Sequence, residues 1–127
     1  MSALGIIELN HVAIAVSDVD ASNRFYRDVL KLEMLPRPAF DFPGSWFRLG
    51  TVQELHLIGE REDPKVTRDQ QSGHFALKVQ DIMTVDKHLK SVGAVYKGPV
   101  TRPDGAKQIF IQDPDGNWIE LFSKQGA

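Results

Sequence analysis

Two short stretches of the chain read as versions of one another: NHVAIAVSD at residues 10–18 and GHFALKVQD at residues 73–81. Each has a histidine in second place, alternating apolar residues after it, and an aspartate at its end. A helical pattern of apolar residues three or four positions apart follows each stretch, over residues 18–32 and 81–92. The repetition predicts two similar modules, in which a strand leads into a helix that an aspartate caps.

Each module is predicted to continue with three further strands. With first strands at 6–16 and 74–79, the others are expected at 32–37, 46–50 and 54–58, and at 95–98, 107–112 and 118–122. The polar stretch GEREDPKVTRDQQSG, at about residues 59–73, is typical of a solvated linker. The sequence therefore predicts a single α+β domain over residues 1–127, built from two βαβββ modules at about 6–58 and 74–122.

Composition narrows the possible functions. A chain of 127 residues with 42% hydrophobic and 25% charged residues is typical of an ordinary globular domain. Its net charge of -2 and the absence of any window dense in Lys and Arg argue against a nucleic-acid partner. It has no cysteine, so a metal ion would have to be held by His, Asp or Glu. Without a signal-peptide pattern or an apolar run near twenty residues, a cytoplasmic protein with no membrane partner is expected.

Alternation along the predicted strands separates two faces of each sheet. In the first strand the large apolar residues share one face, and His11 shares the other with small alanines. His74 has the same place in the second module. The large apolar residues should cover the helices, and the apolar stripe predicted on the first helix consists of Ala21, Phe25, Val29 and Leu32. The opposite face, with its histidines and small residues, is expected to line an open cavity.

The last strands of the two modules add one metal-capable residue each to this cavity face. When they are aligned on their apolar residues, His56 matches Glu120. An inward histidine on a strand is more often a hydrogen-bonded core residue than a ligand. Here, however, four equivalent positions from two repeats all carry such residues. The sequence thus predicts a metal site formed by His11, His56, His74 and Glu120.

The third strand of each module supplies candidate substrate contacts. Alignment pairs Trp46 with Phe110 and Arg48 with Gln112, and places them on the cavity face. Trp46, Arg48 and Phe110 are the predicted pocket residues, although simple barrel packing would explain the aromatic rings equally well. The loop RPDGAK at 102–107 adds cations that could close over a small anionic substrate.

These motifs, together with DPDGNWIEL at residues 113–121, resemble the vicinal oxygen chelate superfamily over about residues 6–122. That group includes glyoxalase I, fosfomycin-modifying enzymes, methylmalonyl-CoA epimerase, extradiol dioxygenases and bleomycin-resistance proteins. The resemblance implies that each mixed sheet curls into a half-barrel around a central cavity. It also implies that one metal ion sits between two modules, held by the first and last strands of each. Those strands carry the same four residues that alternation selects.

The donor types suggest the chemistry of such a site. Three imidazoles and one carboxylate suit Zn, Ni, Fe or Co better than Mg or Ca. A six-coordinate ion would keep two adjacent positions for substrate oxygens and act on them as a Lewis acid. Glu120 is the only carboxylate of the set, and by resemblance to glyoxalase I it is the candidate catalytic base.

Several reactions fit this resemblance. A glyoxalase-I-like isomerase or lyase is favoured by the single pair of modules and by Glu120. Two departures weaken it: glyoxalase I usually has glutamate where this chain has His56, and bacterial glyoxalase I has a glutathione-binding arginine in place of Ala15. His11, His74 and Glu120 alone would suit a fosfomycin-transferase-like or extradiol-dioxygenase-like enzyme. A metal-free bleomycin-resistance-type binding protein is the remaining alternative.

The expected partners are a small-molecule substrate and a second copy of the chain. The resemblance implies a homodimer, because members of this group often dimerise and some build each site from both subunits. The sequence leaves open whether a site would form within one chain or across the dimer.

Overall fold

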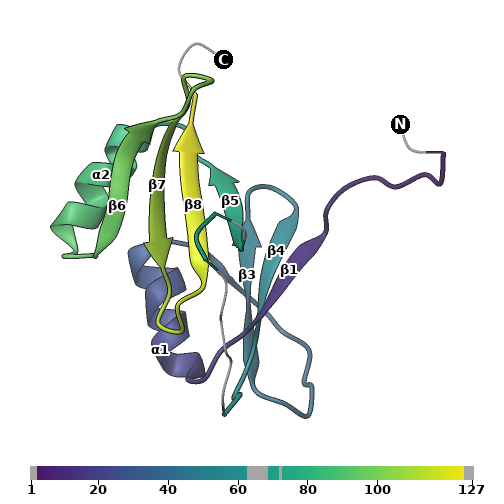
Figure 1. Cartoon of the computed structure of the whole chain (residues 1–127). Coiled ribbons are helices and arrows are strands. Elements are labelled where there is room, and N and C mark those ends of the chain that lie inside the picture. Colours follow the sequence, from purple (N-terminus) through teal and green to yellow (C-terminus); the bar gives the residue numbers. More distant parts are fainter. Residues whose placement is uncertain (1–2, 63–68, 72, 125–127) are drawn as a thin grey trace. The chain divides into compact units, whose positions relative to one another are not determined.

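Each half of the chain builds one open, mixed four-stranded sheet with a helical segment after its first strand (Figure 1). The computed structural model describes residues 3–62, 69–71 and 73–124. The chain divides into two compact units, residues 1–64 and 65–127, and this division falls inside the predicted linker. The predicted α+β class, with two βαβββ modules, is confirmed.

The first half follows the predicted order of elements. They are β1 (His11–Ala15), α1 (Val19–Arg24), η1 (Phe25–Val29), β2 (Met34–Leu35), β3 (Gly44–Leu49) and β4 (Gln53–Ile58). The sheet has the order β1-β4-β3-β2. Strand β1 runs parallel to β4, whereas β3 is antiparallel to both of its neighbours. The first and last strands of the module therefore lie side by side.

Strand β1 is shorter than the predicted strand over residues 6–16. Its partner β4 begins only at Gln53, and the parallel register pairs His11 with Glu54. One further bond, from the Glu54 amide to the Asn10 carbonyl at 3.0 Å, lies at the start of this ladder. The paired part of the strand begins at His11, and residues 6–10 before it are exposed and lie outside the ladder.

The first helix differs from the prediction in its buried face. Asp18 caps α1 as expected, since its side chain accepts a hydrogen bond from the Ala21 amide. After six residues the α-helix gives way to the π-helical η1. Ser22 and Tyr26 are fully buried, whereas the residues of the predicted stripe are only partly covered. Ser22 and Tyr26 are four residues apart and share one face of the helical segment, but a count of apolar residues does not select a face that carries a serine and a tyrosine.

The core of the first half lies between one face of its sheet and the helical segment. The Tyr26 ring packs against Phe47 of β3, with ring centroids 6.0 Å apart. Phe47, Leu55 and Leu57 have no exposed surface, so the apolar face predicted for β3 and β4 is confirmed. Residues that alternate with them, among them Trp46, remain partly exposed on the opposite face.

The second half repeats this arrangement. Its elements are β5 (His74–Lys78), α2 (Ile82–Ser91), β6 (Tyr96–Thr101), β7 (Lys107–Gln112) and β8 (Trp118–Ser123). The sheet order is β5-β8-β7-β6, with β5 parallel to β8. The register repeats as well: Ala13 pairs with His56 in the first sheet, and Ala76 pairs with Glu120 in the second. None of the described helices is long and apolar enough to cross a membrane.

Helix α2 is tied to its sheet at its start and at its middle. The Asp81 side chain caps it by accepting a hydrogen bond from the Met83 amide, and Ser123 of β8 accepts one from the Ile82 amide. At the middle of the helix, the Tyr96 hydroxyl of β6 donates a hydrogen bond to the Asp86 carboxylate. This bond lowers the pKa of Asp86 and raises the pKa of Tyr96 to about 12.

Because Tyr96 donates this hydrogen bond, we expect the free energy of unfolding to fall at high pH. The pKa of Tyr96 is about 12 in the folded chain and 10.0 for an ordinary tyrosine, so the contribution of this hydrogen bond to stability is complete below pH 10. It is then lost as the pH rises through about 12. A Tyr26→Phe variant leaves Tyr96 as the only tyrosine, and its phenolate absorbance should titrate near pH 12. A midpoint near pH 10 would contradict the prediction, and Tyr96→Phe provides the matched control.

Candidate functional site

The first half brings two predicted ligands together on the face of the sheet opposite its core. His11 lies on β1 and His56 on the neighbouring strand β4. Their rings are stacked, with centroids 4.1 Å apart and an interplanar angle of 17°. Trp46, directly across from His56 on β3, stacks on the other side of that ring at 4.1 Å. The three rings therefore form one continuous stack over three adjacent strands.

Glu54 belongs to the same cluster, although it is not among the predicted site residues. Its Oε1 atom lies 2.9 Å from His56 Nε2, and its Oε2 atom lies 3.9 Å from a terminal nitrogen of Arg48. The Glu54 side chain is 23% exposed. Two residues apart on one strand, Glu54 and His56 must point to the same face, so strand alternation could have identified this contact. Arg48, a predicted pocket residue, is thus engaged by a carboxylate.

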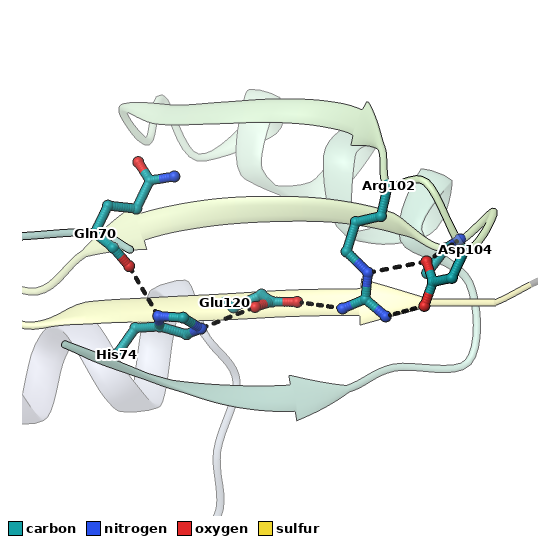
Figure 2. Close-up of polar contacts among 6 residues, drawn as sticks. Gln70, His74, Arg102, Asp104 and Glu120 are labelled. Carbon is teal, nitrogen blue, oxygen red and sulfur yellow. Dashed lines mark hydrogen bonds and ion pairs between the residues drawn. The ribbon is translucent and has the colours of Figure 1, made fainter. Parts of the chain in front are cut away.

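The second half brings together the other two predicted ligands. His74 on β5 and Glu120 on β8 lie on adjacent parallel strands, and His74 Nε2 is 3.0 Å from Glu120 Oε1 (Figure 2). The other ring nitrogen, His74 Nδ1, is 2.8 Å from the Gln70 carbonyl oxygen. Glu120 is 5% exposed. This pair occupies the places that His11 and His56 have in the first half.

Glu120 has a second partner that sequence reasoning did not connect to it. Arg102, in the turn between β6 and β7, donates a hydrogen bond from one terminal nitrogen to Glu120 Oε2 at 3.0 Å (Figure 2). Its Nε atom and its other terminal nitrogen each donate a hydrogen bond to the Asp104 carboxylate. The Arg102 hydrogen bond, together with one from the Ala106 amide, holds the pKa of Asp104 well below its usual range. Asp104 in turn raises the pKa of Arg102.

Phe110 has the position in the second half that Trp46 has in the first. It lies on β7 directly across from Glu120, as Trp46 lies across from His56. Its ring meets the His74 ring edge to face, with centroids 5.3 Å apart. Phe110 is only 6% exposed, whereas a residue that lines a pocket needs a surface that a substrate can touch.

Each half thus presents one pair of the predicted ligands beside one aromatic ring. Within the parts of either half that the structure describes, no three His, Asp or Glu side chains gather closely enough to hold an ion. The role of the four residues as ligands to a shared ion stays a prediction.

Known proteins share this fold and sequence pattern. A protein of Synechocystis sp. named probable lactoylglutathione lyase is 34% identical over 90% of this chain and 93% of its own length. Glyoxylase I 4 of Arabidopsis thaliana is 30% identical over 93% of this chain and 71% of its own. The crystal structure of lactoylglutathione lyase from Agrobacterium tumefaciens is 25% identical, with a TM-score of 0.73 over 94% of this chain and 95% of that one.

The match extends to the family as a whole. Residues 8–121 fit the family described as the glyoxalase/bleomycin resistance protein/dioxygenase superfamily. That span contains both βαβββ modules almost entirely, from β1 to all but the last two residues of β8. Taken with the relative that is 34% identical, it shows that the chain belongs to the glyoxalase/bleomycin resistance protein/dioxygenase superfamily.

Proposed function

We propose that this protein is a divalent-metal-dependent enzyme that acts on a small oxygen-chelating substrate by a glyoxalase-I-like isomerase or lyase reaction. The observation that carries the proposal is the matched placement of two residue pairs, His11 with His56 and His74 with Glu120. Each pair lies on the first and last strands of its module. The lactoylglutathione lyase names of several relatives support the choice of reaction.

The second pair suits a cation on chemical grounds. A carbonyl oxygen only accepts hydrogen bonds, so the contact with Gln70 places the proton of a neutral His74 on Nδ1. Its Nε2 atom is then an acceptor, and it faces another acceptor, Glu120 Oε1, at 3.0 Å. Two such atoms need a proton or a cation between them. Imidazole nitrogen and carboxylate oxygen are both common zinc ligands, so this pair of facing acceptors would fit a shared cation.

The proposed ligands are His11, His56, His74 and Glu120, and the proposed ion is Zn, Ni, Fe or Co. A bound ion would supply Lewis acidity toward the substrate oxygens. The chain itself supplies the proton transfer. The Glu120 carboxylate takes the proton from the C–H bond next to the carbonyl and returns it to the carbonyl carbon, while the hydroxyl proton passes to the former carbonyl oxygen, so the isomerisation needs no external oxidant.

The substrate is proposed to lie against the aromatic residues next to the ligands. Trp46 stacks on His56, and Phe110 touches His74, so an apolar group of a substrate bound at the ligands would meet these rings. Arg48 would face a negative group of the substrate, in competition with Glu54. Ala15 stands where bacterial glyoxalase I has its glutathione-binding arginine. Assays should therefore test which thiol forms part of the substrate.

The proposal includes the single two-module domain, the cytoplasmic location and the homodimer that the sequence predicts. In each sheet the first strand of the module, β1 or β5, is an edge strand. An open sheet of this kind can complete a barrel with the other module of its own chain or with a second chain. Light scattering of the purified protein measures the oligomeric state directly, and a monomer at all concentrations would exclude the dimer.

Metal analysis and three assays test the function. Protein purified without chelator or added metal should contain about one divalent ion per chain, the occupancy of one four-ligand site. It should isomerise a glutathione hemithioacetal, lose that activity on dialysis against a chelator, and regain it with Ni or Zn. A catechol with oxygen and fosfomycin with a thiol are the parallel substrates.

The results separate the alternatives. Oxygen uptake with the catechol would favour the dioxygenase reaction, and a fosfomycin–thiol adduct would favour the transferase reaction. Both remain possible for a site in which His11, His74 and Glu120 form a set of two histidines and one carboxylate. If the purified protein contains no metal, acquires none and still binds small molecules tightly, the proposal of a metal-dependent enzyme is contradicted. That result would support a metal-free binding protein of the bleomycin-resistance type.

A further inference from the structure

Arg102 is held in place by three separate contacts. Its Nε and one terminal nitrogen donate hydrogen bonds to the two carboxylate oxygens of Asp104, at 3.1 and 2.7 Å. Its guanidinium carbon lies over the Phe122 ring, 5.1 Å from the centroid. The remaining terminal nitrogen donates to Glu120 Oε2 at 3.0 Å. A long side chain that would ordinarily sample many rotamers is thereby restricted to one direction.

Hydrogen bonds within the turn that carries Arg102 also hold Asp104 in position to bind the guanidinium group. The Arg102 amide donates to the Ala106 carbonyl at 2.7 Å, and the Gly105 amide donates to the Arg102 carbonyl at 2.9 Å. The Ala106 amide donates to Asp104 Oδ1 at 3.1 Å. Gly105 has φ of +90°, which suits glycine. The residues RPDGA, at 102–106, thus form a hydrogen-bonded turn, called the clamp below, in which the backbone orients Asp104 toward the guanidinium group.

The consequence for Glu120 is that its two oxygens have different partners. Oε2 accepts from Arg102, which leaves Oε1 facing His74 (Figure 2). Rotation of the carboxylate would break both contacts, and its burial leaves few water molecules to replace them. The arginine therefore fixes the orientation in which the Glu120 carboxylate presents its other oxygen to the ligand side.

We propose that Arg102 is a positioning residue, which orients the Glu120 carboxylate for ion binding and proton transfer while Asp104 neutralises its charge. This inference rests on the proposed function, because it assigns Glu120 to the metal site. Neutralisation matters because an unpaired guanidinium group beside a divalent cation would repel it. With Asp104 in place, Glu120 receives a directional hydrogen bond without a free positive charge next to it.

The fork of the guanidinium group explains why arginine is needed. Lysine has a single nitrogen at its tip, which cannot bind both Asp104 oxygens side by side and also reach Glu120 in a fixed direction. Arg102→Lys therefore keeps the charge but loses the clamp. A purely electrostatic role would survive this change, whereas a positioning role would not.

The test measures ion affinity and turnover separately. Zn affinity is determined by competition with a chromogenic chelator, and kcat and KM with the hemithioacetal substrate. Arg102→Ala should lower both Zn affinity and kcat by about 10- to 100-fold, the usual effect of losing an outer partner of a ligand. KM should change less than kcat. Arg102→Lys should also lose affinity, and Asp104→Asn should lose it through the unpaired guanidinium charge. Arg27→Ala, which removes an exposed arginine paired with Asp28, is the matched control and should resemble the wild type.

The Glu120→Gln variant distinguishes failure of the positioning role from failure of the proposed function. If Glu120→Gln loses Zn while Arg102→Ala stays within about twofold of the wild type, the positioning role is wrong and the proposed function stands. Full recovery by Arg102→Lys would likewise overturn positioning in favour of charge alone. If Glu120→Gln binds Zn as tightly as the wild type, the proposed site itself is wrong. Should Arg102→Ala fail to fold, Arg102→Lys and Asp104→Asn give the same decision, because both keep most of the side-chain volume.

Discussion

Replacing Glu120 by glutamine should reduce kcat by about 10²- to 10⁴-fold, the range that a positioned general base contributes. Glutamine keeps the shape of the side chain and can still accept a hydrogen bond from Arg102. It cannot carry the proton, and it offers a metal ion a neutral oxygen in place of a charged one. Because Glu120 is only 5% exposed, water has little access to take over its role. The loss should appear in turnover and in metal content, measured on the same preparation.

Glu54 provides the matched control within the same chain. It is also a partly covered carboxylate in contact with a proposed histidine ligand, at 2.9 Å from His56. Glu54→Gln should lower kcat by no more than about 10- to 100-fold, the usual effect of losing an outer partner of a ligand, because a residue that only orients His56 contributes less than the group that transfers the proton. A larger loss with Glu54→Gln than with Glu120→Gln would assign the base to the first half of the chain. Unchanged turnover in both variants would exclude the proposed isomerase chemistry.

The faces of the strands were predictable from the sequence because alternation is a local property. Two residues apart always means the same side of a strand, whatever the strand pairs with. Phe47 and Leu55 are buried as expected, and Trp46 lies on the opposite face. Once the faces are known, aligning the two repeats is enough to bring His56 into the place of Glu120, and the two ladders have this same register.

Features that depend on a distant partner could not be read in the same way. The start of β1 depends on its pairing with β4, and the buried face of the first helical segment carries Ser22 and Tyr26, which an apolar pattern does not select. The contact between Arg102 and Glu120 joins residues 18 positions apart. Arg102 directly follows β6, whose ladder with β7 shifts register between Lys97 and Val100. Composition and periodicity carry no information on such a shift.

The largest expected loss of stability comes from Phe47→Ala. Phe47 has no exposed surface, packs against the buried Tyr26 ring, and pairs with Met34 and Leu55 on the two neighbouring strands. Its truncation removes a large apolar side chain and leaves a cavity, which should lower the free energy of unfolding by about 3–5 kcal/mol. Because whole domains are stable by about 5–15 kcal/mol, this is a large fraction of the total. Urea unfolding followed by tryptophan fluorescence measures it, since Trp46 is the adjacent residue on β3.

Phe40→Ala gives the same chemical change at an exposed position. Phe40 is 46% exposed and stacks on Phe42 at a centroid distance of 5.3 Å, so its removal opens no enclosed cavity. Its loss should cost less than about 1 kcal/mol. Comparing the two variants tests the division between the two faces of the first sheet. Phe47 lies on the core face of β3, and its neighbours in sequence, Trp46 and Arg48, are proposed to face the site. Equal losses in the two variants would mean that the apolar face of β3 is not the core, and the assignment of Trp46 to the substrate side would fail with it.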